Sequence, residues 1–161
     1  MATVPQTTEE LRAGPARFAE AVYEKQNLDY VDETFAEDWV GHMDGEEMTR
    51  AEYREMHADL LEGFPDVEMT FEAVVVEDDT VAGHWVMTGT HTGEFVGLKP
   101  TDRTLEIGGT FVNRLDEDGL VVESWQTIDR FGMLQQLGVA PEDFGPRALF
   151  KVLLNLLGSA R

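Results

Sequence analysis

The spacing of hydrophobic residues changes once along the chain, from a helical period to a strand period. Up to about residue 64, apolar positions recur every three or four residues, and after it they alternate with polar ones. The first part predicts three helices and the second part predicts a series of long strands. This order indicates an α+β fold, in which the helices close one side of a sheet.

Capping signals mark the starts of the predicted helices, although Gly14-Pro15 could also start the first one, with proline in its first turn. Thr7 with Glu10, and Thr49 with Glu52, have the spacing of a capping box, in which each residue of the pair satisfies a backbone N–H of the other. Asn27 is placed to cap a short helix between them, which continues through Phe35. A short extended piece is expected at residues 39–42. The apolar stripes of the three helices contain Phe18, Ala21, Val22, Leu28, Val31, Phe35, Tyr53, Met56, His57, Leu60, Leu61 and Phe64.

About four long strands follow, and their short turns predict an antiparallel meander. The expected strands are residues 67–75, 81–92, 104–114 and 120–128. The fold expected for residues 1–140 is therefore a curved antiparallel sheet with three N-terminal helices. Residues 141–161 are predicted to add an amphipathic C-terminal helix, which would pack on its own domain or on a second copy.

Charge narrows the choice of partners. The chain has 161 residues, of which 42% are hydrophobic, so one domain with a packed core is expected. Its formal net charge is −20. A surface of this sign repels phosphate backbones and anionic lipids, so neither nucleic acid nor a membrane is expected as a partner. Acids spread along the chain, with few lysines, are typical of proteins from salt-loving organisms, in which cations screen the repulsion.

Several kinds of chemistry are not expected from the sequence. There is no cysteine, so neither disulfides nor thiol catalysis is predicted. The four histidines lack metal-ligand spacing and the acids are dispersed, which argues against a metal site. The first residues do not resemble a secretion signal and no apolar run reaches the ~18 residues of a membrane span, so a cytoplasmic protein is expected.

The candidate for acid/base chemistry is Asp129, where the last predicted strand meets a short helix. The residues alone allow two roles: Asp129 can cap that helix, or it can act as a general base in an apolar pocket. The two roles conflict, because N–H groups bonded to a carboxylate stabilise its charged form. Trp125 and Thr127 share the strand face of Asp129 by the period of two, so all three are expected to line one surface.

Three segments together resemble the SnoaL-like polyketide cyclase family, which belongs to the nuclear-transport-factor-2-like superfamily with ketosteroid isomerase. They are FPD at 64–66, GTHTGEFVGLKPTDR at 89–103 and GLVVESWQTIDRFGMLQQLG at 119–138. The resemblance covers about residues 17–139. It implies a cone-shaped α+β barrel around an apolar pocket, a homodimer, and cofactor-free aldol cyclisation or isomerisation of a small hydrophobic carbonyl compound.

The resemblance also suggests roles for residues. An aspartate in the last strand is the family's general acid/base, which favours catalysis by Asp129. His91 ends the second predicted strand and can be merely a loop contact, but its GTHTG setting makes it the candidate donor to the enolate oxygen. The other residues expected at the ligand are Trp125, Thr127, Trp85, Met87, His57, His42, Asn113 and Trp39.

The sequence leaves open whether the protein is a catalyst and which roles some of its histidines have. The family's cyclases carry a glutamine and a histidine on the third strand, where this chain has Thr110 and Asn113. A module that binds a ligand without catalysis is therefore the alternative. His57 lies on an apolar helix face and can equally be a core residue whose nitrogens are satisfied. His84 alternates away from Trp85 and is expected to be exposed.

Overall fold

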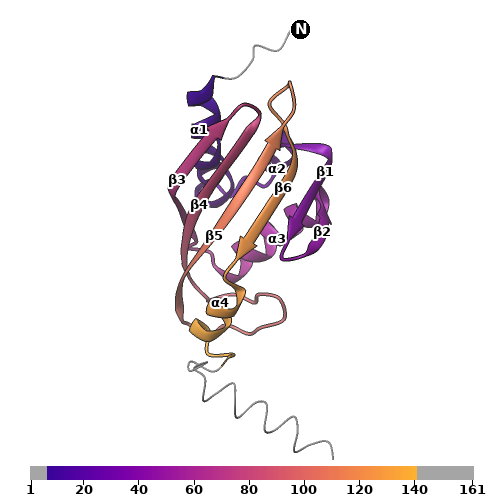
Figure 1. Ribbon diagram of the computed structural model, residues 1–161. Coiled ribbons are helices and arrows are strands. Elements are labelled where there is room, and N and C mark those ends of the chain that lie inside the picture. Colours follow the sequence, from indigo (N-terminus) through magenta and orange to yellow (C-terminus); the bar gives the residue numbers. More distant parts are fainter. Residues whose placement is uncertain (1–6, 141–161) are drawn as a thin grey trace, which may run out of the picture.

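The computed structural model describes residues 7–140 as a six-stranded mixed sheet with helices on one face (Figure 1). The strand order is β2-β1-β6-β5-β4-β3. The strands are β1 (Phe35–Met43), β2 (Glu46–Thr49), β3 (Glu68–Glu77), β4 (Thr80–Thr90), β5 (Thr104–Leu115) and β6 (Val121–Ile128). The helices are α1 (Thr8–Ala19), a π-helical turn η1 (Glu20–Glu24), α2 (Asp29–Thr34), α3 (Arg50–Gly63) and α4 (Arg130–Gln136).

The predicted capping boxes are confirmed at the starts of α1 and α3. Thr7 Oγ1 accepts the Glu10 N–H at 3.2 Å, and Thr49 Oγ1 accepts the Glu52 N–H at 3.3 Å. Asn27 also accepts a backbone N–H at the start of α2, that of Asp29. These bonds satisfy N–H groups that a helix leaves without internal partners. The capping boxes therefore marked the starts of α1 and α3 correctly, and Pro15 lies inside α1. The N-cap of α2 is Leu28, which makes no side-chain capping bond, and not Asn27.

The four predicted long strands are confirmed as β3 to β6, joined in an antiparallel meander. Pairing between β4 and β5 runs without interruption from Thr80 opposite Arg114 to Thr90 opposite Thr104. The two faces of this sheet differ in what covers them. We call the face that carries α1, α2 and α3 the inner face, and the opposite one the outer face (Figure 1).

The prediction of a helix through Phe35 is wrong, whereas the extended piece expected at residues 39–42 is confirmed. Phe35 does not continue a helix but begins the nine-residue strand β1, which includes the expected extended piece. β1 pairs antiparallel with β2 and parallel with β6, where His42 lies opposite Trp125. The sheet therefore has six strands and is mixed. The parallel pairing joins residues about 80 positions apart, so no local pattern reports it.

The core lies between the inner face and the helices. Trp39 is only 2% exposed, and its Nε1–H donates to Ser124 Oγ at 3.0 Å. Within residues 7–140, no helix is both long and apolar enough to cross a bilayer. The predicted C-terminal helix at 141–161 lies outside the described residues.

Candidate functional site

A cavity of about 520 Å³ lies between the inner face of the sheet and the helices. Its wall is mostly aromatic and aliphatic, because inward-facing strand residues meet the apolar stripes of the helices. Large side chains of this wall include Phe18, Trp85, Met87, Ile107, Phe111 and Ile128.

The cavity extends along much of the sheet. Its lining includes Gly119 in the β5–β6 turn and Met133 in α4, two elements that stand at opposite ends of the sheet in Figure 1. Three lining residues are charged, Arg17, Glu33 and Arg130, and all three are exposed. The buried lining therefore consists of side chains without a permanent charge.

Four polar residues lie side by side along the cavity wall: Tyr23 on η1, His57 and Tyr53 on α3, and Gln126 on β6. The hydroxyl of Tyr23 lies 3.0 Å from Nδ1 of His57, and Nε2 of Gln126 donates to the hydroxyl of Tyr53 at 3.0 Å. The rings of Tyr53 and His57 meet edge to face, with centroids 4.4 Å apart. All four residues line the cavity. Two hydrogen-bonded pairs joined by one ring contact thus form a polar strip, here called the hydrogen-bonding strip, in a mostly apolar wall.

Burial keeps this strip uncharged. It raises the pKa of Tyr53 to about 12 and lowers the pKa of His57 to about 4. The pKa of Tyr23 is raised well above its usual value, mainly by burial and further by Tyr53. Removing a charged group from water is costly, so the neutral forms prevail. At neutral pH the strip can exchange hydrogen bonds with a ligand but carries no charge.

Four of the residues predicted at the ligand line the cavity: Trp85, Met87, His57 and Asn113. Asn113 lies on the inner face of β5, and its Oδ1 is buried with no hydrogen-bond partner among the described residues. Trp39 is instead a core residue outside the cavity lining, held by Ser124. Whether any of these residues binds a ligand stays a prediction.

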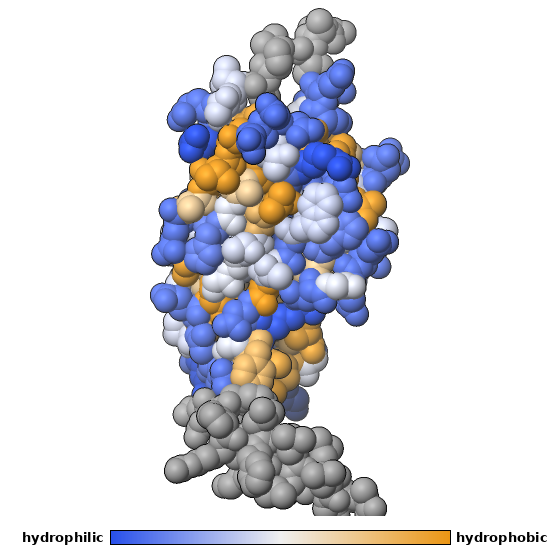
Figure 2. All heavy atoms as spheres, in the orientation of Figure 1, coloured by the Kyte–Doolittle hydropathy of each residue, from blue (hydrophilic) through white to orange (hydrophobic). Residues whose placement is uncertain are grey.

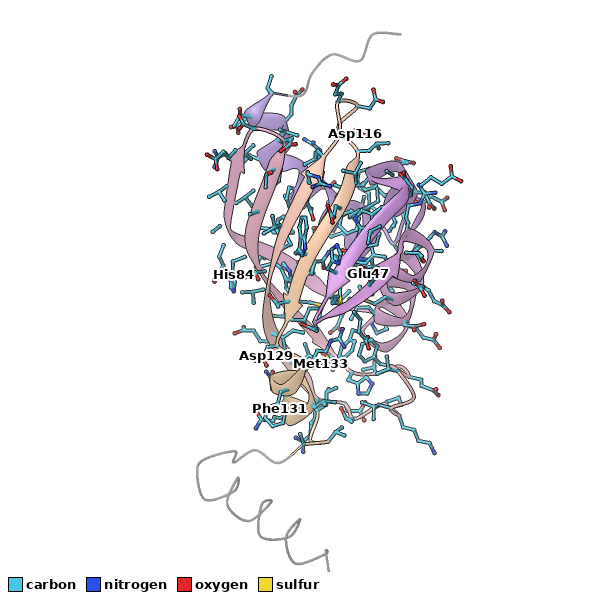
Figure 3. The ribbon with its side chains drawn as sticks, turned by 45° about the vertical axis from the view of Figure 1, so that its right-hand side comes forward. Glu47, His84, Asp116, Asp129, Phe131 and Met133 are labelled. Carbon is cyan, nitrogen blue, oxygen red and sulfur yellow. The ribbon has the colours of Figure 1, made fainter. Side chains whose placement is uncertain are left out.

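Asp129 is exposed and does not belong to the cavity lining. Its Oδ1 accepts the Gly132 N–H at 2.8 Å, which makes it the N-cap of α4, at the junction seen in Figure 3. Both of its neighbours in sequence, Ile128 and Arg130, do line the cavity. Asp129 therefore stands in the capping position at one end of the cavity, and its catalytic role stays a prediction.

His91 is fully buried beneath the loop that follows β4, and it does not line the cavity either. Its ring stacks on Phe64 with centroids 5.1 Å apart, and its Nδ1 lies 3.1 Å from Thr101 Oγ1. Its backbone N–H donates to the Arg103 carbonyl, and its own carbonyl accepts the Asp102 N–H. These contacts hold the loop in place. Neither His91 nor Asp129 lines the cavity, and the role of His91 as a donor stays a prediction.

Trp125, Thr127 and His42 lie on the outer face, so the prediction that they line the pocket is wrong. Trp125 is 41% exposed and stacks on His42, with centroids 5.3 Å apart. Thr127 Oγ1 lies 2.7 Å from Thr110 Oγ1 on β5. His84 also projects from this side, as expected (Figure 3), and its Nδ1 lies 3.1 Å from a carboxylate oxygen of Glu72.

Sequence reasoning missed the polar residues that do reach the cavity. On β6 this residue is Gln126, which lies on the face opposite Trp125 and bonds Tyr53. Tyr23 was missed because it belongs to η1. The wider π-helical turn buries Tyr23 although it does not belong to the apolar stripe predicted from an α-helical period. Alternation along β6 could have singled out Gln126 as an inward polar residue, had the direction of the face been known. Within the described residues, no cluster of three or more histidines and acids could hold a metal ion.

Comparison with known proteins identifies the family. The model of the SnoaL-like polyketide cyclase family matches residues 15–137. IdmH from Streptomyces antibioticus, a provisionally assigned polyketide cyclase, is 31% identical, with a TM-score of 0.65 over 78% of this chain and 99% of that one. The chain therefore belongs to the SnoaL-like polyketide cyclase family.

Two further solved structures share the fold. AclR from Streptomyces galilaeus, a provisionally assigned hydroxylase, is 27% identical, with a TM-score of 0.76 over 84% of this chain and all of that one (100%). A SnoaL-like protein from Jannaschia sp. CCS1 is 21% identical, with a TM-score of 0.68 over 84% of this chain and 99% of that one, and shows the fold alone. No curated protein matches the sequence.

Proposed function

We propose that the protein binds a small hydrophobic carbonyl compound in the cavity and moves a proton on it by cofactor-free acid/base chemistry. The observation that carries this proposal is the hydrogen-bonding strip of Tyr23, His57, Tyr53 and Gln126 in a mostly apolar wall. Apolar pockets with a few placed polar groups are typical of small-molecule sites. Membership of a family of polyketide cyclases supports the same class of ligand.

The reaction that this proposal entails is an aldol-type cyclisation or an isomerisation. Each begins when a base takes a proton from the carbon beside a carbonyl, and a hydrogen-bond donor stabilises the enolate oxygen that forms. In a cyclisation, the enolate carbon then attacks a second carbonyl carbon of the same molecule, and the resulting alkoxide takes a proton. Tyr53 is suited to the donor role, because its oxygen accepts from Gln126 while burial keeps its own proton in place.

The proposed base is Asp129. To act, its carboxylate has to release the Gly132 N–H and turn towards the end of the cavity, between Ile128 and Arg130. Asp129→Asn separates the two roles, because asparagine caps helices as well as aspartate does but cannot take the proton. Turnover is first screened with a panel of neutral hydrophobic diketones. We expect Asp129→Asn to lower turnover by about 100-fold or more, with unchanged ligand affinity. Full turnover by this variant would rule out Asp129 as the base.

A binding module without catalysis is the second candidate. It is favoured by the present position of Asp129, which is exposed and engaged in capping. The two candidates differ in one measurement. A module would bind members of the diketone panel and return them chemically unchanged after long incubation, as followed by mass spectrometry and NMR of the recovered compounds.

A homodimer and a cytoplasmic location stay predictions from the sequence. Sedimentation velocity of the full chain at low and high salt tests the first of them. A net charge of −20 opposes association, so a dimer is expected to be more stable at high salt.

A further inference from the structure

We propose that His57 holds the carbonyl oxygen of a neutral ligand through its Nε2–H group, with Tyr23 as the residue that positions it. This inference rests on the proposed function, because it concerns ligand recognition in the same cavity. Its starting point is that Nε2 of His57 is buried and has no hydrogen-bond partner among the described residues, although the residue lines the cavity. His57 is only 3% exposed, so bulk water does not serve as that partner.

The bond with Tyr23 decides which nitrogen of His57 carries the proton. If Tyr23 O–H donates to Nδ1, the imidazole carries its proton on Nε2, and Nε2–H is the single unsatisfied group. If Nδ1–H donated to Tyr23 instead, the tyrosine proton and the Nε2 lone pair would both lack partners in the described part of the chain. Each buried group without a hydrogen-bond partner adds an uncompensated desolvation cost. The first arrangement leaves fewer, so His57 presents a donor.

The surroundings of His57 keep that donor neutral. Three aromatic rings surround the imidazole, with centroids at 5.5 Å for Phe18, 5.6 Å for Tyr23 and 4.4 Å for Tyr53. The two titratable groups that face it, Tyr23 and Tyr53, are themselves uncharged at neutral pH. No carboxylate within residues 7–140 bonds to His57, and its lowered pKa is consistent with this setting.

A neutral buried donor selects its ligand by chemistry. A carbonyl oxygen satisfies Nε2–H and removes the cost of leaving it unpaired. A hydrocarbon of the same shape leaves that cost in place, and sites built on a buried polar group reject analogues that lack its partner. A carboxylate would bury its charge where the buried lining offers no cation. The preferred ligand is therefore an uncharged ketone or aldehyde.

Three probes of similar size test this order of preference by calorimetry with the full chain. They are 2-acetylnaphthalene, its hydrocarbon counterpart 2-ethylnaphthalene, and 2-naphthoate. We expect the ketone to bind about tenfold more tightly than the hydrocarbon, and the carboxylate to bind most weakly. His57→Phe is expected to reduce the ratio of ketone to hydrocarbon affinity to about one. His42→Phe, at a histidine of the outer face, is the control and is expected to keep the ratio.

The role of Tyr23 is tested by a signal that packing alone does not move. Two-bond ¹⁵N–¹H correlation spectra of the wild type are expected to show His57 as the Nε2–H tautomer. Tyr23→Phe is expected to abolish that preference and to reduce the ketone preference with it. This spectrum needs only the wild-type protein, so it decides the tautomer even if His57→Phe does not fold.

The possible results distinguish a failure of the role of His57 from a failure of the proposed function. If neither 2-acetylnaphthalene nor 2-ethylnaphthalene binds, the proposed hydrophobic ligand site is wrong, and so is the role of His57. If ketone and hydrocarbon bind equally well to the wild type, the site stands and the role of His57 is wrong. A ketone preference that survives in His57→Phe, or an Nδ1–H tautomer in the wild type, also overturns the inference alone.

Discussion

The inner and outer faces of one strand, β6, reverse the usual placement of polar and apolar residues at positions 124–126. Its inner face presents Ser124 and Gln126 to the protein interior, whereas its outer face presents Trp125. The inner polar groups are tolerated because each has a buried aromatic partner, Trp39 or Tyr53. The two faces of β6 therefore show that hydrogen-bond partners, and not hydrophobicity alone, decide which face of a strand is buried.

The outer face has its own organisation. Strand pairing places Trp125, Val112, Ala82 and Val75 in one row across β6, β5, β4 and β3. Figure 2 shows weakly polar and apolar residues along the middle of this face, with hydrophilic residues on both sides. Side chains there contact neighbours across the strands, whereas those of the inner face enclose a cavity.

The largest expected contrast is between the two tryptophans of these faces. Trp85 on the inner face is 6% exposed and Trp125 on the outer face is 41% exposed. Trp85→Ala is expected to lower the free energy of unfolding by about 3–5 kcal/mol, and Trp125→Ala by about 1 kcal/mol. Urea denaturation at one fixed salt concentration measures both. Equal losses would mean that the outer face is buried in solution, for instance by a second copy.

The next effect depends on pH and comes from His57. Its pKa is about 4 in the folded protein and about 6.5 when unfolded, so the unfolded chain takes up the proton first as pH falls. The free energy of unfolding should therefore fall between pH 6.5 and pH 4, by about 3 kcal/mol from this group, and no further below pH 4.

The contribution of His57 is the difference in the free energy of unfolding between the wild type and His57→Gln. Urea denaturation of both proteins between pH 6.5 and pH 4 measures this difference, because the contribution of the acids is common to both and cancels. His42→Gln, on the outer face, is the matched control and should retain most of the wild-type slope. If His57→Gln kept the full slope as well, the imidazole would not be buried in its neutral form.

A smaller effect is expected at Gly109, an inward position of β5. A Cβ atom there would collide with the ring of Trp85 and lie 2.7 Å from the Thr127 carbonyl oxygen. Gly109→Ala is expected to lower the free energy of unfolding by about 1–3 kcal/mol. Thr110→Ala, at the next residue but on the outer face, should change it by less than about 1 kcal/mol. Thermal unfolding of both variants provides the comparison, and a harmless Gly109→Ala would contradict the packing.

The smallest effect is expected at Asp129, at the end of the outer row of β6. Asp129→Ala removes the cap of α4 and should cost about 1 kcal/mol, while Asp129→Asn should cost almost nothing. Chemical denaturation of the two variants compares them directly. Equal losses would show that Asp129 stabilises the fold through its charge and not as a cap.

Local signals in the sequence predicted much of this fold. Capping boxes at Thr7 and Thr49, and the alternation in β3 to β6, depend on neighbours within a few residues and were read correctly. The parallel pairing of β1 with β6 joins distant residues and could not be read in this way. The family match explains why the fold class was found despite this gap.

The candidate site was harder to predict for a related reason. The period of two correctly grouped Trp125, Thr127 and Asp129 on one face, but it does not state which face the helices cover. That choice depends on Tyr53 and Trp39, which approach β6 from other elements and bond its inward polar residues. The sequence therefore named His57 and Asn113 but missed Tyr23 and Gln126.

The π-helical turn η1 makes the cavity sensitive to chain length. Its Lys25 N–H bonds to the Glu20 carbonyl, one residue farther back than in an α-helix, and the widened turn buries Tyr23 against His57. Deletion of one residue within η1 would restore an α-helical turn and rotate the residues after the deletion by about 100° relative to α1. A relative that lacks this extra residue would lose the tyrosine–histidine contact while keeping both side chains. Insertions and deletions at this turn can therefore change the polar lining of the cavity within one unchanged fold.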